Sequence, residues 1–107
     1  IGDVKGKNCL IIDDICDTGG SLCKTAEALI ANGAKSVSAA ITHAVLSGPA
    51  IERITRSNLT ELVVTDSIPL SEAAKNCSKI TQLSVGELLA KAIRRIHSSG
   101  SISNLFV

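Results

Sequence analysis

Two adjacent carboxylates and a glycine-bearing turn stand close together near the start of the chain. Asp13 and Asp14 follow an apolar run, and a short polar turn from Asp17 to Ser21 leads into a helical pattern. Carboxylate oxygens accept hydrogen bonds from hydroxyl groups and are hard ligands for Mg²⁺. A turn that feeds a helix N-terminus offers free backbone N–H groups to a phosphate. The spacing therefore predicts one site for both halves of a sugar phosphate.

The turn itself has the residue types of a phosphate loop. Gly19 and Gly20 allow the backbone to approach an oxyanion closely, and Thr18 and Ser21 supply hydroxyl donors. Taken alone, a Thr-Gly-Gly-Ser sequence is more often an ordinary turn. Its position between an acid-tipped strand and a helix favours phosphate binding instead.

The elements that must position this turn alternate between strands and helices, which predicts an α/β fold with a mostly parallel sheet flanked by helices. The expected strands are 9–13, 37–41, 62–64 and 80–83, and the expected helices are 21–32, a short one after Pro49, a turn at 71–74 and a last one at 84–97. Because successive strand side chains point to opposite faces, only one of the two acids is expected to face a ligand, unless the strand has already ended. Cys16 is expected in the loop.

Residues 11–21 resemble the signature of proteins that bind phosphoribosyl diphosphate, which type I phosphoribosyltransferases and ribose-phosphate diphosphokinases share. Five further segments resemble the diphosphokinase family, in order: 42–43, 46–50, 63–69, 90–97 and 101–106. The resemblance covers nearly the whole chain and is to the C-terminal part of that family. Ser21 stands where threonine is more usual, and both residues carry the hydroxyl.

The resemblance implies a partial phosphoribosyltransferase-like domain and a reaction. The reaction is diphosphoryl transfer from MgATP to the 1-hydroxyl of ribose 5-phosphate, giving phosphoribosyl diphosphate and AMP. The family likeness assigns ribose 5-phosphate to seven residues: Asp13, Asp14, Asp17, Thr18, Gly19, Gly20 and Ser21. Within that set, it implies that Asp13 and Asp14 lie at the ribose hydroxyls and the Mg²⁺ cofactor. It further implies a cytoplasmic homo-oligomer, a hexamer built from dimers.

Residues 98–107 are expected to form a tail after the last helix. A chain terminus has no role by default. The resemblance implies that Ser101, Ser103 and Phe106 help to bind an inhibitory nucleotide diphosphate or an activating phosphate at a subunit interface. The ATP pocket and catalytic basic loop of the family lie N-terminal to this sequence. No catalytic residue is therefore assigned here, and the segment alone is expected not to turn over.

Two alternative functions share the same loop. A type I phosphoribosyltransferase would bind the diphosphate as its substrate, and the match through residues 90–97 and the tail disfavours it. A non-catalytic synthetase-associated regulatory subunit looks alike throughout but has a degraded phosphate loop. The intact residues 17–20 favour the enzyme.

Other polar residues have plainer interpretations. His43, at a strand end, is expected to pack or cap rather than to catalyse. In the last helix, Val85, Leu88, Leu89, Ala92, Ile93 and Ile96 line one face. Ser84 and Glu87 could form its capping box. Arg94, Arg95 and His97 are expected to match its negative C-terminal end.

Composition excludes several classes of protein. The chain has 107 residues, 45% of them hydrophobic, with a single Phe, no Trp or Tyr, and a net charge of +1. A nucleic-acid binder would usually show a basic patch and stacking aromatics. No apolar run approaches the roughly 18 residues of a membrane helix. The four cysteines lack the close pairs of a metal site, which favours reduced thiols. The absence of methionine predicts a piece of a longer protein.

Overall fold

The computed structural model describes residues 2–97, so the predictions for Ser101, Ser103, Phe106 and the rest of the tail lie outside the described residues. The strands are β1 (Asn8–Cys16), β2 (Ser36–Ala44), β3 (Leu59–Thr65) and β4 (Ile80–Leu83). The helices are α1 (Gly20–Ala31), α2 (Ala50–Arg56), α3 (Glu72–Lys75) and α4 (Gly86–His97). Each strand is followed by a helix, as the sequence predicts.

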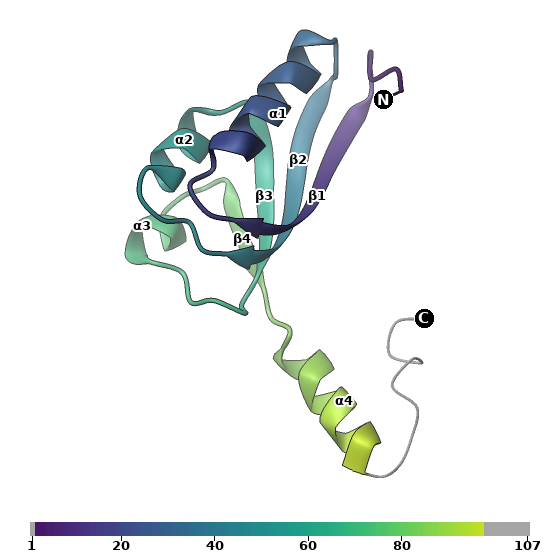
Figure 1. Cartoon of the computed structure of the whole chain (residues 1–107), viewed down its shortest axis with the longest axis vertical. Helices are drawn as coiled ribbons and strands as arrows, with labels where there is room; N and C mark the ends of the chain where they lie inside the picture. The colour runs from purple at the N-terminus through teal and green to yellow at the C-terminus, as the bar shows by residue number, and fades with distance from the viewer. Residues whose placement is uncertain (1, 98–107) are drawn as a thin grey trace.

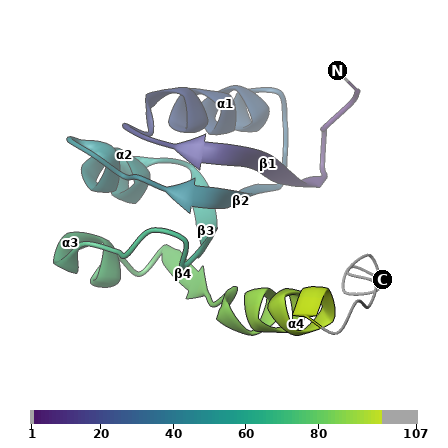
Figure 2. The same cartoon turned by 60° about the horizontal axis from the view of Figure 1, so that its bottom comes forward.

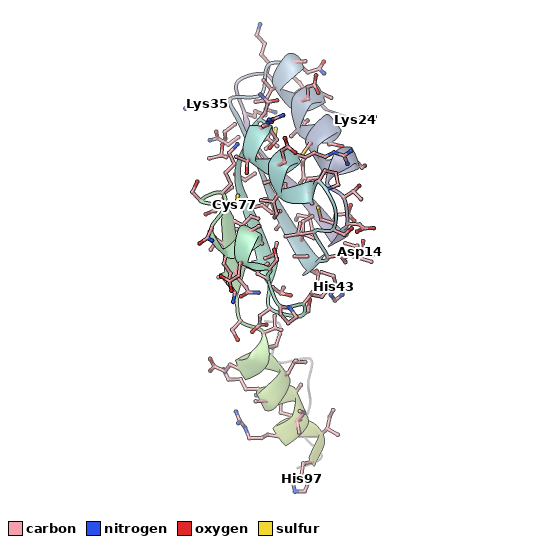
Figure 3. The ribbon with its side chains drawn as sticks, turned by 90° about the vertical axis from the view of Figure 1, so that its left-hand side faces the viewer. Asp14, Lys24, Lys35, His43, Cys77 and His97 are labelled. Carbon is pink, nitrogen blue, oxygen red and sulfur yellow. The ribbon has the colours of Figure 1, made fainter. Side chains whose placement is uncertain are left out.

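The four strands form one parallel sheet in the order β1-β2-β3-β4. Strands added in one direction by right-handed crossovers place their connecting helices on the same face. Figure 3 shows α1 and α2 in front of the strands on that face. The carboxyl ends of the strands meet at one edge, from which the loop into α1 emerges (Figure 1). The α/β prediction with a parallel sheet is confirmed.

The first strand is longer than the sequence pattern predicts. β1 does not end at the carboxylates but continues to Cys16, which pairs with Ala44 of β2. The placement of Cys16 in the loop was therefore wrong. A strand ends where its neighbour stops offering backbone partners, and β2 extends to Ala44. Because Asp13 and Asp14 lie within a paired strand, their side chains diverge to opposite faces.

The core fills one face of the sheet. Fully buried side chains from the two central strands and from α2 form it: Val37, Ala39, Leu59, Leu62, Val64 and Ile54. α1 adds Leu22 and Ala26, which lie on its sheet-facing side as the helical spacing predicts. The opposite face is open, since Leu10 is 60% and Ile12 is 77% exposed.

Local capping signals are reproduced at two helices. Gly33 follows the end of α1 in the left-handed region, with φ 93°, the backbone conformation that favours glycine at a helix C-terminus. Ser71 caps α3, because its Oγ accepts a hydrogen bond from the Ala74 N–H at 3.2 Å. Both features are decided by residues only a few positions apart.

α4 projects away from the sheet beyond the end of β4 (Figures 1 and 2). Within the described part of the chain it contains no buried residue. The expected capping box is absent there, because the helix begins at Gly86 and Ser84 Oγ accepts from the Gly86 N–H instead. The Val85 N–H bonds to Asp66 Oδ1 at 2.9 Å. No helix within residues 2–97 is long and apolar enough to cross a membrane.

Candidate functional site

The predicted phosphate loop lies between the end of β1 and the start of α1, where it lines a small cleft. The cleft has a volume of about 190 Å³. It is lined by Asp13 and the loop residues Asp17, Thr18, Gly19, Gly20 and Ser21, together with apolar neighbours from β1, β2 and α1. The structure thus brings a carboxylate and the turn to one cavity. Drug-sized ligands usually occupy about 300–1,000 Å³, so this cleft suits a smaller molecule.

The two adjacent acids are placed differently. Asp13 is paired with Ile41 of β2 and shares the cleft with it. Asp14 is not among the described residues that line this cavity, and it lies at the same edge of the sheet as His43 (Figure 3). The Asp14 N–H donates to Asp13 Oδ1 at 2.8 Å. The strand alternation therefore selects Asp13 as the acid that faces the loop.

Asp17 is held in place by Ser47, a residue to which the sequence assigned no role. The Ser47 N–H donates to the Asp17 carbonyl at 2.9 Å, and the Ser47 hydroxyl donates to Asp17 Oδ1. The Leu46 N–H donates to the Cys16 carbonyl at 3.1 Å. The chain after β2 thus continues alongside the loop and orders its first residue. In the sequence, the only signal for this role of Ser47 is that residues 46–50 resemble the diphosphokinase family, a resemblance that gave them no function.

The N-terminus of α1 is open toward the cleft. Gly19, the residue before the helix, is buried. Its backbone has φ 79° and ψ −2°, a left-handed conformation that residues with a side chain rarely adopt. No side chain among the described residues caps this helix end. The first N–H groups of a helix lack partners within the helix, and they carry the positive end of its dipole. They are therefore available to an anion.

A second contact approaches the loop from α2. Arg53 Nη1 donates to the Thr18 carbonyl at 3.1 Å. It lies in a larger groove of about 990 Å³ between α1 and α2, on which Gly20 and Ser21 also border. The loop thus lies between the small cleft and the larger groove. The carboxylate of Asp13 lines only the smaller one, which is why we place the candidate site there.

Comparison with known proteins shows the family and the fold of the chain. The model of the phosphoribosyl synthetase-associated domain matches residues 1–107. The chain belongs to this family. Ribose-phosphate pyrophosphokinases of Xanthomonas axonopodis pv. citri and Xylella fastidiosa are 61% and 60% identical to it over 107 residues, which is all of this chain and 34% and 33% of those proteins. The crystal structure of phosphoribosylpyrophosphate synthetase from Mycobacterium smegmatis superposes with a TM-score of 0.88 at 42% identity, covering 94% of this chain and 33% of that one.

The chain therefore spans about a third of the length of the relatives that it matches. The resemblance implied that this third is their C-terminal part, and the comparisons do not bear out that placement. The geometry of the cleft does not depend on it. Family membership and fold are shown for this phosphoribosyl synthetase-associated domain.

Magnesium is the cofactor that the family implies. Mg²⁺ usually keeps several waters and takes one or two carboxylates plus substrate phosphates. Among residues 2–97 there is no group of three or more His, Cys, Asp or Glu side chains that could hold a metal ion. Both carboxylates are exposed, and that of Asp13, which lines the cleft, supplies an oxygen ligand of the preferred kind. The residues therefore fit a Mg²⁺ ion that is held partly by substrate. They do not fit an ion that is enclosed by protein ligands alone.

The thiol of Cys16, next to the predicted phosphate loop, is not poised for covalent chemistry. Burial raises the pKa of the Cys16 thiol, and its electrostatic interactions with Cys23, Asp17 and Asp13 act in the same direction. Cys16 is thus kept protonated and is a poor nucleophile. His43 Nδ1 lies 2.9 Å from the Ser67 hydroxyl, which donates to the Thr42 carbonyl at 3.1 Å. His43 is exposed, so the prediction that it packs is wrong, and the contact described for it is this hydrogen bond.

Proposed function

We propose that the cleft at the end of β1 binds ribose 5-phosphate as part of a ribose-phosphate diphosphokinase. One observation carries the proposal: Asp13 and the loop 17–21 line a single cavity of about 190 Å³. An acid that accepts hydrogen bonds and a helix N-terminus that attracts anions recognise opposite ends of a sugar phosphate. The names of the relatives that cover the whole chain agree with this substrate class.

In this proposal the 5-phosphate lies against the N-terminus of α1. The backbone N–H groups there donate to it, and Thr18 and Ser21 add hydroxyl donors. Asp13 accepts hydrogen bonds from ribose hydroxyls on the β1 side of the cleft. Asp17, ordered by Ser47, maintains the turn between them. The carboxylate of Asp13 would hold Mg²⁺, which neutralises phosphate charge when bound; Asp14, which the resemblance also implies as a ligand, does not line the cleft.

The reaction would be in-line attack of the ribose 1-hydroxyl on the β-phosphorus of MgATP. An oxygen–phosphorus bond forms, the bond from the β-phosphorus to the oxygen of the α-phosphate breaks, and AMP leaves. The hydroxyl proton passes to a base or to water. This chain's contribution is to fix the sugar in position, which reduces the entropy cost of the reaction. No residue between 2 and 97 is assigned to the ATP site.

The binding half of the proposal is tested by calorimetric titration of the chain with ribose 5-phosphate in the presence of Mg²⁺. Asp13→Asn is expected to weaken binding by about tenfold or more, because it removes the acceptor that faces the cavity. Asp14→Asn is its matched control and should have a smaller effect. Ribose without phosphate should bind at least tenfold more weakly, since loop contacts to the charged phosphate are the stronger ones. Equal affinity for ribose and ribose 5-phosphate would contradict the proposal.

The catalytic half is tested by AMP release from MgATP with and without ribose 5-phosphate. Ribose-dependent AMP requires an ATP site and is expected only when the rest of a synthetase is present with this segment. A phosphoribosyltransferase would instead consume phosphoribosyl diphosphate in the presence of a nucleobase. A regulatory subunit would yield neither product and would bind ribose 5-phosphate no more weakly after Asp17→Asn.

The family resemblance also implies how the protein assembles and how it is regulated. We expect a homo-oligomer, which sedimentation of the chain with the rest of a synthetase would test. The regulatory role of Ser101, Ser103 and Phe106 remains a prediction from the resemblance. Inhibition by a nucleoside diphosphate should be lost when Phe106 is changed to Ala.

A further inference from the structure

Arg53 is attached to the phosphate loop although it lies 35 residues further along the chain than Thr18. Its Nη1 donates to the Thr18 carbonyl at 3.1 Å. The same nitrogen lies 3.1 Å from the position that a Cβ at Gly20 would occupy. The guanidinium therefore packs directly against the loop backbone, and a side chain at residue 20 would force it to move.

The Thr18–Gly19 peptide is held through its carbonyl oxygen. In a planar trans peptide the carbonyl oxygen and the following N–H point in opposite directions. Arg53 holds the oxygen on the α2 side, and the Gly19 N–H on the other side partly offsets the rise in the pKa of the Cys16 thiol that burial causes. The orientation of this peptide sets the direction in which the chain enters α1.

We propose that Arg53 is a positioning residue for the phosphate loop, which acts by holding the Thr18 carbonyl and not by lending its charge to the bound phosphate. The inference rests on the proposed function, because it takes the loop to bind the 5-phosphate. A loop that is already ordered loses less conformational freedom when its ligand binds. A hydrogen bond from a charged donor is stronger than one between neutral groups. Arg53 thereby raises affinity for a group that it does not touch.

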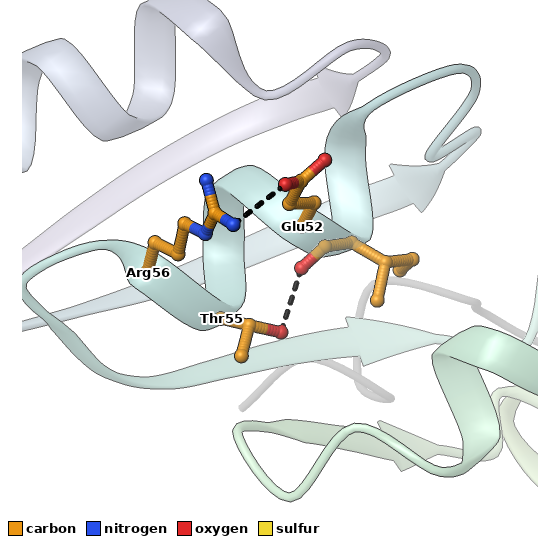
Figure 4. A network of polar contacts seen from close by, with 4 residues as sticks. Glu52, Thr55 and Arg56 are labelled. Carbon is orange, nitrogen blue, oxygen red and sulfur yellow. Dashed lines mark hydrogen bonds and ion pairs between the residues drawn. The ribbon is translucent and has the colours of Figure 1, made fainter.

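Arg56 provides a matched control on the same helix. It carries the same charge and borders the same groove between α1 and α2. Its Nη2 forms an exposed ion pair with Glu52 Oε1 at 3.0 Å (Figure 4). No hydrogen bond from Arg56 to the loop is recorded within residues 2–97. Replacing Arg56 removes a nearby positive charge without releasing the Thr18 carbonyl.

The test compares Arg53→Ala, Arg53→Lys and Arg56→Ala in the full chain. Backbone amide NMR of Thr18, Gly19, Gly20 and Ser21 is recorded without ligand, and the affinity for ribose 5-phosphate is measured by calorimetry. Arg53→Ala should shift the loop amides, lower their order parameters and weaken binding by about tenfold. Arg53→Lys, which retains a charged donor, should recover part of both losses. Arg56→Ala should leave the amides unchanged and affinity within about twofold.

Two results would overturn the inference. One is a set of loop amide shifts that are the same in Arg53→Ala as in the unchanged chain. The other is an equal loss of affinity in Arg53→Ala and Arg56→Ala, which would mean that charge alone acts. If the unchanged chain binds no ribose 5-phosphate, the proposed function fails, and the loop amides still decide whether Arg53 positions the loop. Because Arg53 is exposed, its replacement is expected to leave the melting temperature of the fold nearly unchanged.

Discussion

The two faces of the sheet differ in what covers them, although the same four strands form both. On one face Val37, Ala39 and Leu62 are fully buried beneath α1 and α2. On the other face Leu10 and Ile12 are largely exposed. Parallel sheets are almost always covered on both faces. The comparison shows that the described residues form a complete core on the side that supports the phosphate loop, and only that side.

The covered face is also the face on which the site is built. α1 begins at the loop, and α2 contacts the loop through Ala50 and Arg53. The same helices that bury the core therefore orient the backbone groups of the cleft. Stability of the covered face and geometry of the site are coupled, whereas the open face can change without moving the loop.

The largest expected effect comes from removing a core side chain on the covered face. Leu62→Ala should lower the free energy of unfolding by about 2–5 kcal/mol, because it loses buried contacts and leaves a cavity. Ile12→Ala, on the open face, should change it by about 0.5 kcal/mol or less. Urea denaturation followed by circular dichroism measures both. If both variants lost the same free energy of unfolding, the two faces would not differ, because Ile12 would then be buried in solution.

A pair of adjacent alanines sharpens the comparison within one strand. Ala39 is fully buried, whereas the neighbouring Ala40 points to the open face. Ala39→Leu should destabilise the chain by about 1–3 kcal/mol through overpacking. Ala40→Leu should stay within about 0.5 kcal/mol of the unchanged chain. Thermal melts of the two variants measure these changes in stability. If Ala40→Leu destabilised the chain as much as Ala39→Leu, the face on which Ala40 lies would not be open.

The smallest expected effect concerns α4, which neither face of the sheet buries. Hydrogen bonds from the Val85 N–H and the Ser84 hydroxyl lower the pKa of Asp66 below its usual value. Since the folded pKa is the lower one, the stabilising contact is present above the ordinary aspartate pKa and is lost as pH falls through the lowered value. The Val85 amide shift should follow this transition in an NMR titration. In Asp66→Asn the transition should disappear, and its persistence would show that another group is responsible.

Several features were predictable because their signals are local. The Gly33 helix end, the Ser71 cap and the alternation of β2 each depend on residues a few positions apart. The end of β1 was not predictable in this way, because backbone pairing with β2 carried it past the acids to Cys16. The helix start at Gly86 likewise displaced the expected capping box. In both cases a neighbouring strand or loop overrode the local pattern.

The sequence by itself determined where the phosphate loop lies, which residue types it offers and that a parallel sheet supports it. Only the tertiary structure decided that Asp13 faces the cleft, that Ser47 orders Asp17 and that Arg53 holds Thr18. The partners in these last two contacts are 30 and 35 residues apart. Local patterns are set by the geometry of one helix or strand, whereas such contacts exist only after β2 and α2 have packed beside the loop.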